Sequence, residues 1–116
     1  MWTVLTTDTF DEWFDSQSDD TQEKVLSGLV ALRNGGPSIG RPLVDTVKAS
    51  QHKNMKEIRI QHRGDPIRAF FAFDPLRQAI VLCAGNKVGN EKRFYKDMIP
   101  VADREFTNHL SELENK

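Results

Sequence analysis

Basic and aromatic side chains in the middle of the chain are the residues best suited to chemistry. Arg68 lies within residues 67–74, where apolar and other residues alternate. This alternation predicts a strand with two different faces, so we expect Arg68 opposite the apolar residues Ile67, Ala69, Phe71 and Phe73. Lys87 follows the next apolar segment, and Tyr95 lies a short loop further along the chain.

These residue types suit an RNA ligand. Lysine and arginine bind phosphates, and an aromatic ring stacks on an unpaired base. Strand cleavage by attack of the ribose 2′-hydroxyl needs charge stabilisation at the phosphorane and a proton donor for the departing 5′-oxygen. Arg68 and Lys87 can supply at least the first. A basic face that only neutralises an acidic partner protein fits the same residues, so both interpretations remain open.

Other catalytic signatures do not occur. The sequence has no glycine-rich phosphate loop, and its one cysteine, Cys83, lies in an apolar segment where a buried thiol is expected. His52, His62 and His109 lack the spacing of a zinc site. His52 and His62 lie in the basic region and could carry protons, but a surface histidine without a role is the favoured interpretation of each. Asp103 is expected on a solvated helix face, as is Glu105. We therefore predict no metal, no cofactor and no carboxylate mechanism.

The charge distribution supports a basic site. Residues 1–47 carry three basic and eight acidic side chains, a net of −5, whereas residues 48–96 carry eleven and four, a net of +7. Residues 97–116 carry two and five, a net of −3. Local charge, rather than the whole-chain value of −1, decides where phosphates bind. A solvated sheet face balanced by acidic helices is the alternative.

The elements that must position these residues follow from periodicity. We predict a strand at 2–6, a helix capped by Asp8, and a second helix beginning with the capping pair Asp20 and Glu23. Residues 37–54 are predicted to form a loop, and strands follow at 56–62, 67–74 and 78–85. The last segment, 91–115, is helical, with a kink or a new start at Pro100. The predicted order is β-α-α-β-β-β-α, an α+β fold with an antiparallel sheet.

The chain length fits a single domain spanning residues 1–116. The main core is expected between the two N-terminal helices and one sheet face, and its predicted members are Trp13, Phe14, Leu26, Leu29, Phe71 and Phe73. One cysteine excludes an intrachain disulfide. Because no signal peptide or membrane-spanning run is recognisable, we expect a cytoplasmic protein that does not contact membranes.

Residues 55–110 resemble the HigB-like, phage-related branch of the RelE/ParE toxin superfamily. The shared features are a strand beginning KEIR, the basic strand IRAFFAFDP, an apolar strand that ends near a lysine, and RFY before the last helix. The upstream segment GRPLVDTVKASQHKNMKE fits the same pattern. The resemblance implies a RelE-like fold, with two helices packed on one face of an antiparallel sheet and a C-terminal helix.

The resemblance also implies an activity. It implies a metal-independent, ribosome-dependent endoribonuclease that cuts mRNA in the ribosomal A site and is inhibited by a helix-turn-helix (HigA-like) antitoxin. By position, Arg68, Lys87 and Tyr95 match the catalytic residues of the family, although many relatives have arginine where Lys87 stands. The residues expected to bind RNA are Lys56, Arg59, His62 and Arg93.

Two alternatives share the fold. One is a ParE-like toxin that binds DNA gyrase and cleaves nothing, and the other is an inactive binding or regulatory module. The combination of Arg68, Lys87 and Tyr95 favours the nuclease, since a gyrase binder does not need them. For the antitoxin, we expect docking on the acidic N-terminal helices, which carry Asp11, Asp15 and Asp19. Direct occlusion of the basic site remains the other mode.

Overall fold

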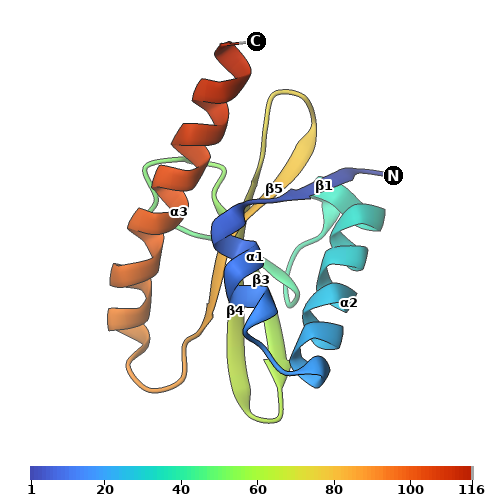
Figure 1. Cartoon of the computed structure of the whole chain (residues 1–116), viewed down its shortest axis with the longest axis vertical. Helices are drawn as coiled ribbons and strands as arrows, with labels where there is room; N and C mark the ends of the chain where they lie inside the picture. The colour runs from blue at the N-terminus through green and yellow to red at the C-terminus, as the bar shows by residue number, and fades with distance from the viewer. Residues whose placement is uncertain (116) are drawn as a thin grey trace.

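The computed structural model describes residues 1–115, which form a five-stranded sheet with helices on both faces (Figure 1). Its elements, in chain order, are β1 (Thr3–Thr6), α1 (Asp8–Asp15), α2 (Asp19–Gly35), the short 3-10 helix η1 (Gly36–Ser38), β2 (Val44–Thr46), β3 (Lys56–His62), β4 (Asp65–Phe73), β5 (Gln78–Asn86) and α3 (Glu91–Glu114). The predicted order is confirmed, with one addition. Strand β2 lies in the segment that was expected to be a loop.

Side-chain caps define where the helices begin. Thr7 caps α1, because its hydroxyl oxygen accepts a hydrogen bond from the Phe10 backbone N–H at 3.1 Å. Ser18 caps α2 in the same way. The sequence-based assignment of these caps to Asp8 and Asp20 was wrong by one and two positions. Both aspartates instead lie in the first helical turn, where a negative charge favourably meets the helix dipole.

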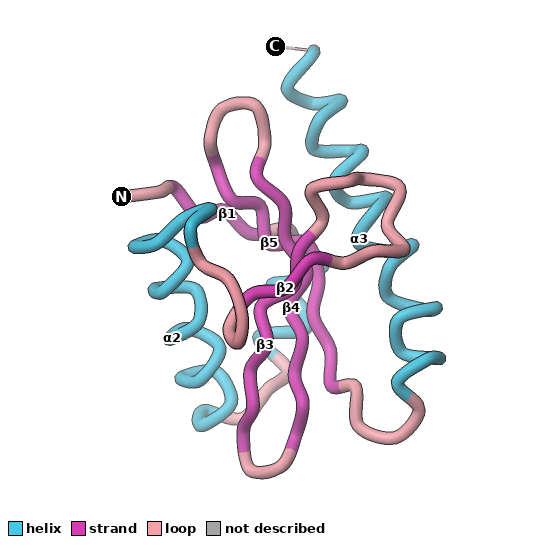
Figure 2. The backbone as a smooth tube through the Cα atoms, turned by 180° about the vertical axis from the view of Figure 1, so that it is seen from behind, coloured by secondary structure: helices cyan, strands magenta, loops and turns pink. Residues whose placement is uncertain are grey.

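The strand order is β1-β5-β4-β3-β2. All neighbouring pairs are antiparallel except β1 and β5, which run parallel, so the prediction of a purely antiparallel sheet was wrong at this edge. A parallel pair needs a long connection between its two strands. Here two helices and three strands separate β1 from β5 along the chain, so the condition is met. Figure 2 shows the sheet from behind, with α2 and α3 on opposite sides of it.

Each face of the sheet packs against its own helices. Helices α1 and α2 cover one face through Phe10, Val25 and Leu32, which pack with Ile58, Ile60, Ile67, Ala69 and Phe71. Helix α3 covers part of the other face through Ile99, Ala102 and Phe106, which pack with Phe70, Ala72, Ile80 and Leu82. The alternation predicted for β4 is therefore confirmed. The Arg68 face is not open to solvent, because α3 lies over part of it and leaves Arg68 only 4% exposed.

Most of the predicted core is confirmed. Phe71 is fully buried, and Trp13, Phe14, Leu29 and Phe73 are partly buried against the same cluster. Leu26 was wrongly placed, since 49% of it is exposed. The residues of α2 that face the sheet are Val25, Gly28 and Leu32, and this spacing turns Leu26 toward solvent.

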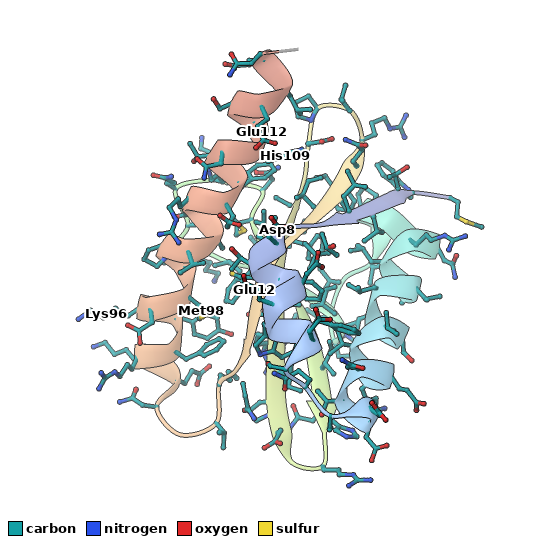
Figure 3. The ribbon with its side chains drawn as sticks, viewed as in Figure 1. Asp8, Glu12, Lys96, Met98, His109 and Glu112 are labelled. Carbon is teal, nitrogen blue, oxygen red and sulfur yellow. The ribbon has the colours of Figure 1, made fainter. Side chains whose placement is uncertain are left out.

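Helix α3 lies against the sheet and also against the loop before β3. It continues through Pro100 without a new start, and Met98 points toward the sheet while Lys96 points away from it (Figure 3). The loop before β3 is tied to α3, because Asp103 accepts hydrogen bonds from the Ser50 hydroxyl and the Gln51 N–H. Asp103 is thus not the purely solvated residue expected. No helix within residues 1–115 combines the length and apolar character needed to cross a bilayer.

Candidate active site

Two arginines stand side by side on the sheet face that α3 covers. Arg59 of β3 and Arg68 of β4 are direct cross-strand partners, so their side chains leave the sheet on the same side. Arg68 is only 4% exposed. The Nε atoms of both arginines are buried and have no hydrogen-bond partner. Within residues 1–115, neither guanidinium forms an ion pair with a carboxylate.

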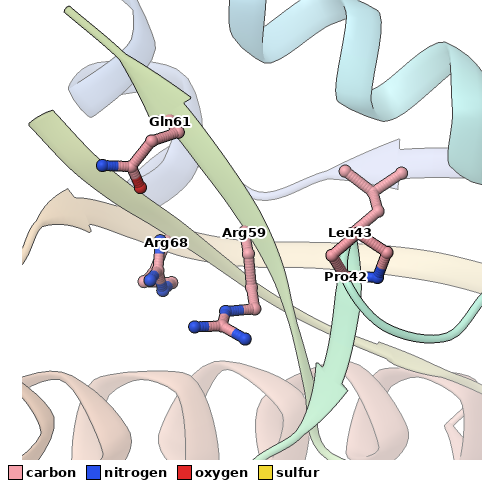
Figure 4. Close-up of a pocket in the computed structure, with 5 residues that line it drawn as sticks. All are labelled: Pro42, Leu43, Arg59, Gln61 and Arg68. Carbon is pink, nitrogen blue, oxygen red and sulfur yellow. The ribbon is translucent and has the colours of Figure 1, made fainter. Parts of the chain in front are cut away.

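These arginines line a pocket of about 360 Å³. Its other walls are Pro42, Leu43 and Gln61, and both guanidinium groups point into the same space (Figure 4). Like charges on directly opposed strands destabilise a sheet, and a buried donor without a partner costs about 1–3 kcal/mol. An anion in the pocket would relieve both costs, because guanidinium forks bind phosphate oxygens two at a time. The lining of the pocket is therefore compatible with an anionic group.

Tyr95 lies next to the arginines at the start of α3. Its ring packs edge-on against Phe70 at 6.1 Å between centroids, and its hydroxyl donates a hydrogen bond to Glu57 Oε1 at 2.7 Å. Burial, followed by the hydrogen bond and charge of Glu57, raises the pKa of Tyr95 to about 12, against the opposing effect of Arg68. Tyr95 is therefore a neutral phenol at physiological pH.

Lys87 completes the cluster from the end of β5. Its backbone N–H donates to the Pro66 carbonyl at 2.9 Å, which holds the start of the loop against β4. Its ammonium lies 5.7 Å from the centroid of the Tyr95 ring and 2.8 Å from Glu91 Oε1. Only 13% of the Lys87 side chain is exposed. The hydrogen bond and charge of Lys87 lower the pKa of Glu91.

The structure thus brings together the three residues predicted to be catalytic, Arg68, Lys87 and Tyr95, and adds one of the four predicted to bind RNA. Arg59 is that residue. Lys56 and His62 share the β3 face of Ile58 and Ile60, on the opposite side of the sheet. Arg93 lies outside the cluster, 80% exposed and 3.9 Å from Asp97.

Sequence reasoning missed two contributions to the site. Glu57 was not singled out, although it is an acidic residue next to a basic strand start, on the same β3 face as Arg59. Pro42 and Leu43, which form one wall of the pocket, were also missed. They lie in residues 37–54, a segment that was expected to be a plain loop. The prediction that Cys83 is buried is confirmed, and burial raises the pKa of its thiol to about 12.

Comparison with solved structures defines the class of fold. A mutant of the Escherichia coli toxin RelE in the free state matches with a TM-score of 0.59, covering 78% of this chain and 87% of that one at 12% identity. The intact E. coli RelBE toxin–antitoxin complex matches with a TM-score of 0.55, covering 73% and 95% at 10% identity. The fold is therefore RelE-like, as predicted.

Comparison of sequences defines the family. Residues 12–107 match the family described as phage derived protein Gp49-like (DUF891). Two Mycobacterium tuberculosis proteins, named putative toxin HigB2 and putative toxin HigB3, are each 45% identical to this chain, over 104 and 101 residues. The chain belongs to the Gp49-like family, which confirms the resemblance to the HigB-like branch. The alignment spans 89% of this chain but only 52% of HigB2, and 87% of both this chain and HigB3.

Proposed function

We propose that this chain is the toxin of a type II toxin–antitoxin pair and that it inhibits translation by cleaving mRNA in the ribosomal A site. The observation that carries the proposal is the arginine pair, whose buried Nε atoms have no partner and whose guanidinium groups line one pocket. The 45% identity to two proteins named putative HigB toxins supports it, as does the RelE-like fold.

In this proposal the scissile phosphate lies between Arg59 and Arg68. Attack by the ribose 2′-hydroxyl builds a phosphorane with additional negative charge, which two fixed guanidinium groups stabilise without reorganising. Lys87 adds a third positive charge, and Tyr95 supplies a hydroxyl beside the reacting atoms. We propose that no metal ion is required, because these cations supply the charge that a metal would otherwise provide. Lys56, His62 and Arg93 contact RNA only where the strand extends beyond the pocket.

The proposed partners follow from this assignment. They are the ribosome, the mRNA in its A site and a cognate antitoxin of the helix-turn-helix type, all in the cytoplasm. The antitoxin is supported by the match to the RelBE toxin–antitoxin complex.

Cell-free translation followed by primer extension on the mRNA tests the proposal. We expect cuts within translated codons when the protein is added, and none when Arg68→Ala is added instead. Intact mRNA together with inhibited DNA gyrase would replace the nuclease with a gyrase-binding toxin of the same fold. Intact mRNA with no effect on growth or on gyrase would indicate a binding module.

A further inference from the structure

Glu57 is a buried acid beside the arginine pair that binds neither arginine. It is 6% exposed and lies two residues before Arg59 on the same face of β3. A buried carboxylate so close to two unpaired guanidinium groups would be expected to form an ion pair. Instead, Glu57 Oε1 accepts the hydrogen bond of the Tyr95 hydroxyl at 2.7 Å. The Glu57 carboxylate is therefore hydrogen-bonded to Tyr95 and not paired with either arginine.

The packing around Tyr95 keeps this contact in place. Glu57 is the cross-strand partner of Phe70, and Phe70 packs edge-on against the Tyr95 ring. Phe94 contacts the Tyr95 ring as well, at 5.3 Å between centroids. The ring is thus held between aromatic neighbours, and the hydroxyl oxygen, which the Arg68 side chain also approaches, can accept a hydrogen bond while it donates its own to Glu57. A neutral phenol between a carboxylate and a substrate hydroxyl is the geometry of a proton relay.

We propose that Glu57 is the proton acceptor behind Tyr95 in RNA cleavage. The ribose 2′-hydroxyl gives its proton to the Tyr95 oxygen while Tyr95 gives its own proton to Glu57. The 2′-oxygen forms a bond to phosphorus, the bond from phosphorus to the 5′-oxygen breaks, and the 5′-oxygen takes a proton from the Lys87 ammonium. The products are a 2′,3′-cyclic phosphate and a 5′-hydroxyl. Tyr95 is the catalytic residue that touches substrate, and Glu57 is a positioning residue that acts through it. This inference rests on the proposed function.

The hydrogen bond itself is tested by spectroscopy, because Tyr95 is the single tyrosine of the chain. The near-ultraviolet absorbance of tyrosinate therefore reports on this residue alone. We expect a titration midpoint at about 12 in the folded protein and a lower midpoint in Glu57→Gln. Glu12→Gln, which removes an exposed acid on α1, should leave the midpoint unchanged. An equal midpoint in Glu57→Gln and the parent would overturn the proposed contact.

The relay is tested by separating cleavage from binding. In Glu57→Gln we expect single-turnover cleavage to fall about 10²–10³-fold. The dissociation constant for ribosomes carrying an mRNA with a 2′-deoxy A-site codon should stay unchanged or decrease, because the site loses one negative charge. A purely structural role would weaken binding together with cleavage. That result overturns the relay, as does Glu57→Gln cleaving at the parental rate.

A second variant covers the case in which Glu57→Gln does not fold. Tyr95→Phe keeps the ring and its packing and removes only the hydroxyl, and we expect a similar fall in cleavage. If both fold, the double variant should cleave no more slowly than the slower single variant, since both changes interrupt one relay. Full activity of Tyr95→Phe would overturn the relay while leaving the nuclease assignment intact. Failure of the parent protein to cleave mRNA would instead overturn the proposed function.

Discussion

At the scale of single residues, the arginine pair shows a conflict between stability and the proposed activity. Arg59 and Arg68 place two positive charges opposite one another, and their buried Nε atoms make no hydrogen bonds. Arg68 Nη1 does donate a hydrogen bond, at 3.0 Å, but only to the carbonyl of its neighbour Ile67. A fold does not need such an arrangement, whereas the proposed phosphate-binding site would use both cations.

The Arg68→Ala variant separates these two roles. We expect it to remain folded and to lose cleavage about 10²–10³-fold, because one charge-stabilising donor is removed from the transition state. Growth arrest in cells should disappear with it. Arg104→Ala, an exposed arginine on α3, is the matched control and should arrest growth like the parent. A folded Arg68→Ala protein that still arrests growth at the parental rate would remove Arg68 from the active site.

At the scale of elements, strand β4 carries the core on one face and the site on the other. Phe71 is fully buried between β4 and the N-terminal helices, while Arg68 and Phe70 face α3. Phe71→Ala should lower the free energy of unfolding by about 3–5 kcal/mol, through lost burial and the cavity left behind. Leu26→Ala, at an exposed position of α2, should change it by less than about 0.5 kcal/mol. Chemical denaturation of both variants measures the difference, and equal stabilities would contradict the assigned core.

A second element-scale contact joins the β4–β5 turn to the C-terminal half of α3. The buried Asp74 carboxylate accepts hydrogen bonds from the Leu76 and Gln78 N–H groups and lies 2.7 Å from His109 Nε2. Burial raises the pKa of Asp74, but the hydrogen bonds from His109, Gln78 and Leu76 together outweigh it, so the pKa lies below the usual value of an aspartate. Other acids stand near His109 in an adjoining hollow, namely Asp8, Glu105 and Glu112, of which Figure 3 labels Asp8 and Glu112.

This contact predicts acid sensitivity. Because the pKa of Asp74 is lower in the folded protein than in the unfolded chain, the stability it contributes is present above the unfolded value and is lost as pH falls through the folded value. The free energy of unfolding should therefore decline below a pH of about 4. Asp74→Asn should be less stable than the parent at neutral pH and should show a smaller decline on acidification. Urea denaturation at neutral pH and at a pH below about 4 tests this. The control is Asp97→Asn, which changes an exposed aspartate. An unchanged decline in Asp74→Asn would assign the effect to other carboxylates.

At the scale of the whole molecule, charge is segregated between surfaces. The acidic side chains of α1 and α2 include the exposed Asp11, Asp15 and Asp19, whereas the basic pocket lies on the opposite face of the sheet, which α3 partly covers. We predict that the antitoxin docks on the N-terminal helices and prevents entry into the ribosome. Reversal of the three aspartates to lysine should then weaken the toxin–antitoxin complex more than reversal of Arg68 and Lys87 to glutamate. Calorimetric titration ranks the two, and the opposite ranking would favour direct occlusion of the site.

The sequence by itself determined those features that depend on neighbours along the chain. The alternation of Ile67, Ala69, Phe71 and Phe73 placed Arg68 on the opposite face, because successive strand residues point to opposite sides whatever packs against them. The family resemblance selected three residues, Arg68, Lys87 and Tyr95, that the fold then brings into one cluster. Errors within helices were small shifts, such as the cap at Thr7 and the exposed Leu26.

Only the tertiary structure decided what stands across from each residue. Cross-strand register placed Arg59 beside Arg68, and the packing of α3 brought the Tyr95 hydroxyl to Glu57. The same packing covered part of the sheet face that carries Arg59 and Arg68. These contacts join residues far apart along the chain. Their geometry depends on strand register and on how the whole core packs. Neither can be inferred from the periodicity of residues that are neighbours along the chain.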